Sequence, residues 1–282
     1  MAGASMNDIK ARIKSVSGTM QITKAMELVA ISKLRRAREN VESSRPFFTL
    51  LKGAIEQLRS SRDAQDTVWR TPKEVGKTLF VVIAGDRGLA GGYNSNVFKY
   101  AASLKDSADA VYLPVGKKSY DYYRYRSESL YSAAFTEVGD VSISDSYAMA
   151  RIITEGYVKG EFDKVILVYT KFVSMMSQSV AHEQILPLSE DEAKSTEQSD
   201  PIFEGEVDEI LARIIPQYVG GIVYSAVCES LASEFSARRM SMNAANKNAQ
   251  EMIDSLMLGY NRARQAVITQ EITEIVSGAE AL

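Results

Sequence analysis

The segment most suggestive of chemistry is a glycine-rich run, Gly85-Asp-Arg-Gly-Leu-Ala-Gly-Gly-Tyr-Asn94, between an apolar stretch and a helical pattern. Free backbone N–H groups at the start of a helix attract anions, so this context favours a phosphate-binding loop. The dinucleotide fingerprint requires glycine at its third position, where this run has Arg87. We therefore interpret the run as a tight strand-to-helix turn that needs glycine backbone angles, with nucleotide binding as the alternative.

Two other short motifs fail on spacing or context. Gly76-Lys77-Thr78 looks like the end of a P-loop, but Thr71 stands where the earlier glycine is needed and the motif precedes its strand. His182-Glu183 looks like half of an acid–base pair, but the chain has no second histidine. We interpret His182 as a polar residue on a sheet face, and no catalytic residue is predicted.

Composition limits the remaining classes of function. One cysteine and one histidine rule out an intrachain disulfide and the common zinc sites, so no metal or cofactor is expected. An aromatic and basic cluster at 120–126 could stack on bases, but the net charge of −3 disfavours nucleic acid, and a helix flank or protein contact is the better interpretation. No apolar run approaches the roughly 18 residues of a membrane span, so membrane association is expected only through partners.

The first element is a long predicted helix over about 7–62. Its apolar residues step by three and four, the narrow seam of a coiled coil, and Pro46 is expected to kink or interrupt it. The seam positions are Ile9, Ile13, Val16, Met20, Thr23, Met26, Ala30, Leu34, Ala37 and Val41.

The last element is a second long helix. The helical pattern resumes at Val207, with a kink or restart expected at Pro216, and 232–282 reads as one uninterrupted helix. At about 1.5 Å per residue some 45 residues span roughly 70 Å, too long for a compact globule, so this helix needs a partner. Its predicted seam is Ala249, Met252, Leu256, Tyr260, Ala263 and Val267.

The middle of the chain alternates strands with helices. Strands are predicted at 78–84, 110–115, 164–173 and 178–188, the last two as a hairpin around 175–177, and helices at 94–107, 117–126 and 144–159. A linker is expected at 65–76 and a loop at 189–206. The fold class is therefore an α/β insert with a partly parallel sheet on a long antiparallel coiled coil formed by the N- and C-terminal helices, divided as 1–70, 71–206 and 207–282.

The C-terminal helix has an unusual surface. Asn, Gln, Thr and Arg are interleaved with Met and Ile, which suits a helix enclosed by protein on several sides better than one facing water. The residues that single it out are Arg238, Arg264, Gln265, Thr269 and Glu271.

These motifs resemble the gamma subunit of F-type ATP synthase from about Met6 to the C-terminus. The resemblance is carried by 22–26 (ITKAM) with 33–37, by 85–94, by 232–238, and by 260–271 with 274–279. It implies that Lys24, Met26 and the five residues above contact the hexamer of α and β subunits. Three positions depart from the usual pattern: Gln21, Arg239, and the turn, where Gly85 and Ala90 replace Ser and Cys.

The resemblance also implies a function. The chain would be a non-catalytic rotor shaft, one copy per complex, that couples ion-driven rotation of the membrane c ring to ATP synthesis on the β subunits. Its partners would be the α and β subunits, the epsilon subunit and the c ring. Its place would be peripheral, on the cytoplasmic side of the bacterial plasma membrane. The alternatives are a structural coiled-coil adaptor with an α/β head, and an enzyme that binds nucleotide at the glycine-rich turn.

Overall fold

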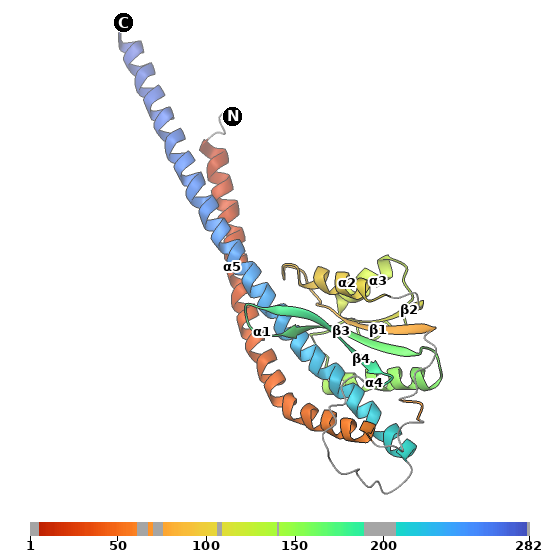
Figure 1. Ribbon diagram of the computed structural model, residues 1–282. Coiled ribbons are helices and arrows are strands. Elements are labelled where there is room, and N and C mark those ends of the chain that lie inside the picture. The colour runs from red at the N-terminus through yellow and green to blue at the C-terminus, as the bar shows by residue number, and fades with distance from the viewer. Residues whose placement is uncertain are drawn as a thin grey trace. The chain divides into compact units, whose positions relative to one another are not determined.

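The computed structural model describes residues 6–60, 67–69, 76–105, 109–139, 141–188 and 207–280. The first and the last of these ranges are each one long helix. Helix α1 spans Met6–Ser60 and helix α5 spans Val207–Glu280 (Figure 1). Each continues through its proline, so Pro46 and Pro216 do not interrupt their helices. The predicted loop 189–206 lies outside the described residues, as does most of the predicted linker 65–76.

Between these two helices in the sequence, four strands form a mixed sheet. Its strands are β1 (Lys77–Ile83), β2 (Asp109–Val115), β3 (Lys164–Phe172) and β4 (Gln178–Leu186). The order is β2-β1-β3-β4, with β1 parallel to both neighbours and β3 antiparallel to β4. The partly parallel sheet and the hairpin are therefore confirmed; Ser174 and Ser177 exchange backbone hydrogen bonds at its turn.

Three helices complete the insert: α2 (Tyr93–Ser103), α3 (Lys117–Tyr125) and α4 (Ile143–Val158). Helix α4 begins where Ser142 and Asp145 form a capping box, each side chain accepting a hydrogen bond from the other residue's backbone N–H. This exchange satisfies N–H groups that a helix start otherwise leaves unpaired, which explains where the helix begins.

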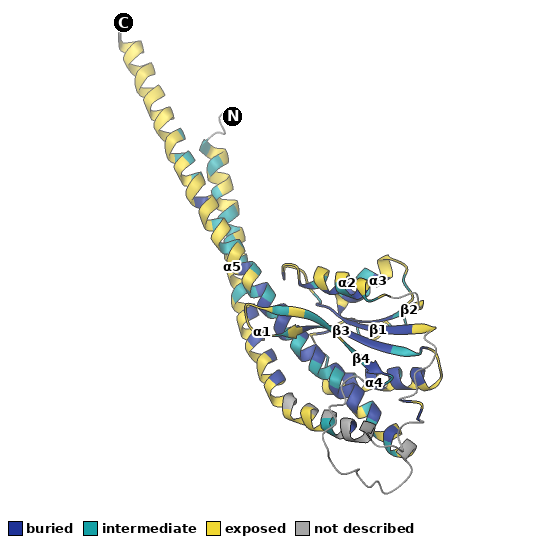
Figure 2. Ribbon diagram, viewed as in Figure 1, coloured by how far each residue is buried: buried dark blue, intermediate teal, exposed yellow. Residues whose placement is uncertain are grey.

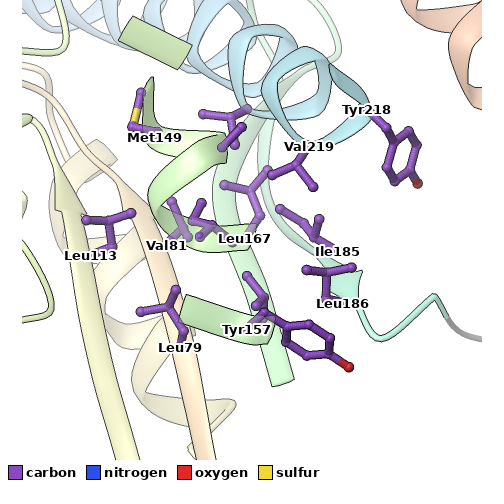
Figure 3. Close-up of a cluster of buried hydrophobic side chains, with 14 of the residues drawn as sticks. Leu79, Val81, Leu113, Met149, Tyr157, Leu167, Ile185, Leu186, Tyr218 and Val219 are labelled. Atoms are coloured by element: carbon purple, nitrogen blue, oxygen red, sulfur yellow. The ribbon is translucent and has the colours of Figure 1, made fainter. Parts of the chain in front are cut away.

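Alternation along β1 divides the core into two layers. Phe80 and Val82 pack with residues of α2 and α3 on one face of the sheet. Leu79 and Val81 lie on the other face, because successive side chains of a strand point in opposite directions. That second face is covered by α4 and by the first part of α5, as Met149 and Val219 show in Figure 3.

The chain forms two compact units. Residues 1–30 group with 239–282, and residues 31–238 form the second unit, which contains the sheet. This grouping cuts across both long helices, whereas the predicted division into 1–70, 71–206 and 207–282 follows the order of elements along the chain. The three-part division remains a prediction.

Within the first unit, α1 and α5 pair along the predicted seam. From Ile9 to Met26 the predicted positions of α1 are partly buried, and Ala30 is fully buried. On α5 the seam prediction was wrong at Val267, which is 41% exposed, and at Met252, which is 54% exposed whereas Ile253 is only 8% exposed. Both choices keep steps of three and four between Ala249 and Leu256, and only packing decides between them.

Among the described residues, Glu209–Ala279 of α5 is long and apolar enough, by composition, to cross a membrane. Its best 18-residue window has a mean hydropathy of 1.3 and is 44% buried inside the protein. The core helix of a soluble protein passes the same test, and Leu211, Ile215 and Val219 of α5 belong to the sheet core. The apolar composition is therefore weak evidence for a membrane span.

Candidate functional site

The described residues of the chain leave the end of α5 uncovered. Every residue from Arg264 to Ala279 is exposed, as the continuous exposed colouring in Figure 2 shows. Four of the predicted contact residues, Arg264, Gln265, Thr269 and Glu271, lie here. The structure therefore brings them together on one accessible stretch of helix.

Apolar side chains form a stripe on this stretch. The apolar stripe consists of Ile268, Ile272, Ile275 and Val276, exposed by 46%, 57%, 72% and 51%. At about 100° per residue these side chains share an arc of about 100° on the helix. Contiguous exposed apolar surface marks interaction sites, so the stripe is a candidate contact with another protein.

The predicted polar contacts border this stripe on both sides. On the same helical projection Arg264 and Glu271 lie outside one edge and Thr269 outside the other. Gln265 lies within the arc, near the edge that Thr269 follows. The Thr269 hydroxyl donates to the carbonyl oxygen of Gln265 at 2.9 Å, so its donor is used within the helix. The arrangement is an apolar centre with a polar rim, the usual anatomy of a protein interface.

The predicted residues of α1 lie in or beside the seam. Lys24 is exposed and Met26 is partly buried. A polar triad adjoins Met26: the Thr23 hydroxyl donates to Asn246 Oδ1 at 2.5 Å, and Asn246 Nδ2 donates to Glu27 Oε2 at 2.9 Å. Sequence reasoning placed Thr23 in the seam but missed Asn246 and Glu27.

Arg238 lies in the other compact unit and is used inside the chain. It is 7% exposed, and its Nη2 donates to the Glu234 carboxylate at 2.5 Å and to the Gly88 carbonyl oxygen at 3.2 Å. Glu234 is also buried, at 4% exposure. Sequence reasoning missed this pair, although the four-residue spacing of Glu and Arg on a helix was a signal for it.

Burial dominates the electrostatics around this pair. It raises the pKa of the Glu234 carboxyl above the ordinary value, against the opposing effect of Arg238. Burial also raises the pKa of Tyr93 far above its ordinary value, and the phenol donates to the Ser230 carbonyl oxygen at 3.1 Å. The pair therefore lies in a poorly solvated environment shared with the start of α2.

The glycine-rich turn is held from several directions. The Asp86 carboxylate accepts hydrogen bonds from the backbone N–H groups of Lys117, Val138 and Gly139. Asn94 accepts one from Gly85 N at 2.9 Å. These contacts make Asp86 and Asn94 structural residues of the turn.

Backbone angles confirm the interpretation of the run as a tight turn. Gly91 has a φ of 58°, the region that favours glycine, and Leu89 adopts a φ of 62° without being glycine. A Cβ on Gly85 would lie 2.7 Å from the Glu234 carboxyl carbon, so the close approach of α5 explains that glycine.

The remaining candidates take part in local packing. His182 is an exposed residue of β4, as predicted, and its Nδ1 is 2.9 Å from the Tyr100 hydroxyl. In the aromatic cluster Tyr123 stacks on Tyr112 with 4.0 Å between the ring centroids. The guanidinium carbon of Arg126 lies 3.9 Å from the centroid of the Tyr122 ring. Within the described part of the chain, no group of three or more His, Cys, Asp or Glu side chains could hold a metal ion.

Comparison with known proteins defines the class. A sequence model described as ATP synthase matches residues 5–282. The ATP synthase gamma chain of Ruminococcus albus is 44% identical over 284 residues, covering 98% of each chain. The sodium ion specific ATP synthase gamma chain of Acetobacterium woodii is 41% identical over 297 residues, again covering 98% of each. The chain therefore belongs to the ATP synthase gamma chain family.

Solved structures agree on the fold. A chain in the mitochondrial ATP synthase of Euglena gracilis has a TM-score of 0.65 at 20% identity, covering 98% of this chain and 94% of that one. A chain in the central stalk and c ring of the Tetrahymena thermophila enzyme has a TM-score of 0.62 at 24% identity, covering 79% and 99%. The predicted combination of an α/β insert with long terminal helices is confirmed.

Proposed function

We propose that the chain is the central rotor shaft of an ATP synthase, turning inside a hexamer of α and β subunits while it is fixed to a membrane ring of c subunits. Catalysis would take place on the β subunits and not on this chain. The complex would be membrane-associated, with this chain peripheral on the cytoplasmic side of a bacterial plasma membrane and in contact with the membrane only through partners.

One observation carries the proposal: the end of α5 has an apolar stripe with a polar rim, and no other described part of the chain covers it. A free-standing adaptor would leave this surface in water, which is unfavourable. A surrounding sleeve of subunits would bury the stripe and meet Arg264, Gln265, Thr269 and Glu271 around it. The remaining predicted contacts, Lys24, Met26 and Arg238, belong to the same proposal.

Coupling places a further requirement on the shaft. A shaft that binds all conformations of a catalytic subunit equally shifts none of them. The two sides of the stripe differ: the charged residues Arg264 and Glu271 lie outside one edge, and the uncharged Gln265 and Thr269 lie close to the other. Such a helix presents a different face to each surrounding subunit as it turns.

Reconstitution tests the proposal directly. The full chain is mixed with α and β subunits, and the complex is weighed by native mass spectrometry. We expect one copy per hexamer of three α and three β subunits. Absence of a complex, or several copies in it, would favour the adaptor; tight binding of a fluorescent nucleotide to the chain alone would favour the enzyme.

A further inference from the structure

Helix α5 contacts the sheet unit in two chemically different ways. From Leu211 to Val227 its buried side chains are apolar and pack on the sheet. Over the next turns most of them are hydroxyl and charged groups, which hydrogen-bond to the β3–β4 hairpin and to the glycine-rich turn. We call this second group the polar lock: Glu229, Ser230, Ser233, Glu234, Ser236 and Arg238.

One side of the polar lock bonds to the β3–β4 hairpin. Ser230 Oγ accepts from Thr170 N and Ser233 Oγ donates to the Thr170 carbonyl oxygen, both at 3.2 Å. One turn later Ser236 Oγ donates to the Met175 carbonyl oxygen at 2.6 Å. Ser233 and Ser236 are 0% and 1% exposed, so these hydroxyls have little access to water.

The other side of the polar lock bonds to the glycine-rich turn. Arg238 donates to the carbonyl oxygens of Arg87 and Gly88, and Glu234 fixes the guanidinium. The turn is itself held by Asp86, which accepts three backbone hydrogen bonds from elsewhere in the sheet unit. Both segments that bond to the polar lock, the β3–β4 hairpin of the sheet and the anchored turn, are therefore parts of the α/β domain.

The two sets of bonds reach widely separated sides of the helix. At about 100° per residue, the polar lock spans about 200° of the circumference from Ser236 to Arg238. The remaining arc includes Ala232, which packs against Leu34 and Ala37 of α1. At this level the helix therefore has contacts around most of its circumference.

Directional bonds resist rotation in a way that apolar packing does not. The hydrophobic effect is non-directional, so an apolar helix face can roll on a sheet while keeping much of its burial. Hydrogen bonds weaken steeply with misalignment. Rolling the helix here would leave buried hydroxyls, carbonyls and a charge unpaired, and such groups are costly.

We propose that the polar lock is the torsional connection of the shaft, the level at which α5 and the α/β domain are forced to turn as one body. The inference rests on the proposed rotor function and assigns these six residues as positioning residues for torque transfer. Removing the serine hydroxyls should soften the connection without preventing assembly, because alanine fits the space and favours helix.

A rotation experiment on the assembled complex tests the lock. The α and β subunits are immobilised and a probe is attached to the α/β domain of the full chain. The variant S230A/S233A/S236A is compared with S225A/S241A/S255A, three serines of the same helix outside the lock. With rotation arrested, we expect the angular variance of the probe to rise severalfold in the lock variant only.

The outcomes separate the lock from the proposed function. Normal rotation with equal angular variance in wild type, lock variant and control overturns the lock and leaves the rotor role intact. If the wild-type chain does not rotate inside the immobilised hexamer, the rotor role itself is overturned. If the triple variant does not assemble, S236A alone is compared with S241A by the same measurement, and equal variance again overturns the lock.

Discussion

Arg238 lies one helical turn after Glu234, and both side chains are buried, with 7% and 4% exposure. A buried ion pair is balanced between desolvation and attraction, so removing one partner costs more than the pair contributes. The arginine also donates to two turn carbonyls, which makes the pair a bridge between helix α5 and the glycine-rich turn.

We expect Arg238→Met to destabilise the sheet unit by about 3–5 kcal/mol, because it leaves Glu234 buried and unpaired. The double variant E234Q/R238M should lose less free energy of unfolding than E234Q and R238M lose together as single variants. Urea unfolding followed by the fluorescence of Trp69, the one tryptophan, measures each change, since Trp69 is 7% exposed and stacks on Tyr157 in this unit. Simple additivity would contradict the pairing.

Stability should also depend on pH through Glu234. Because burial raises its pKa, the folded state binds this proton more tightly than the unfolded state. Its contribution to the free energy of unfolding is full below the ordinary pKa of 4.5 and is lost as pH rises through the folded-state pKa. The stability of wild type minus that of E234Q should therefore fall as pH rises from 4.5.

Glu155, whose pKa is shifted in the opposite direction, provides the control for this pH series. The hydrogen bond from Arg151 holds the pKa of Glu155 below its ordinary value. Its contribution is therefore present above the unfolded-state pKa and lost as pH falls. The difference between wild type and E155Q should rise with pH, and equal slopes for both glutamates would refute the assignment for Glu234.

Gly85→Ala should be destabilising, by about 1–3 kcal/mol, as overpacking usually is. The added Cβ would lie 2.7 Å from the Glu234 carboxylate, which cannot move away without breaking its bond to Arg238. Gly88→Ala is the matched control in the same turn, because a Cβ added there would have nothing within 4 Å and the φ of Gly88 lies outside the left-handed region. Thermal unfolding of both variants measures the difference, and equal midpoints would argue against the close contact.

Asn246→Leu should stabilise the coiled coil but loosen its register. A polar residue in such a seam specifies alignment at a cost in stability. Here Asn246 bonds to both Thr23 and Glu27. We expect a higher melting temperature by circular dichroism together with a broader set of pairings between the two helices.

Cysteine cross-linking measures that register, with Cys228 first replaced by alanine. In an antiparallel pair, Met20 and Ala249 lie about one turn beyond Thr23 and Asn246 and should cross-link as cysteines. A cysteine pair at Val16 and Ala249 requires a shift of about one turn and should cross-link only with Asn246→Leu. Absence of the shifted product in that variant would show that the apolar seam alone sets the register.

Ile272→Asp should weaken assembly with α and β subunits and leave the chain itself intact. The side chain is 57% exposed and central in the apolar stripe, so the charge costs little until a partner buries it. Ser277→Asp, on the opposite side of the helix, is the control. Native mass spectrometry of the mixtures gives the bound fraction, and equal fractions for both variants would remove the stripe from the interface.

Periodicity predicted the coiled coil well on α1 and less well on α5. The seam of α1 has a single consistent path of steps, and the structure covers the residues on it. Between Ala249 and Leu256 two paths are equally regular, through Met252 or Ile253, and the choice depends on the facing helix. A long-range contact decided what local spacing left open.

The candidate site shows a similar limit. Exposure of Arg264, Gln265, Thr269 and Glu271 agrees with a helix that ends among partners, although their contacts remain a prediction. For Arg238, sequence reasoning saw a charge on a helix and assigned it outward. Its guanidinium bonds to Glu234 on its own helix and also to the carbonyl oxygens of a turn 150 residues earlier, and nothing in the local sequence encodes the approach of that turn.

The seam and the apolar stripe share one helix, so the residue count between them sets their phase. The seam faces a direction about a third of a turn away from the stripe, at about 100° per residue. Inserting one residue between Ile253 and Ile268 would swing the stripe by about 100°, whereas seven would return it to within about 20°. Insertions or deletions in this part of α5 should therefore be tolerated in steps of seven residues. The length of the helix thus sets the direction in which the stripe faces as well as its distance from the seam.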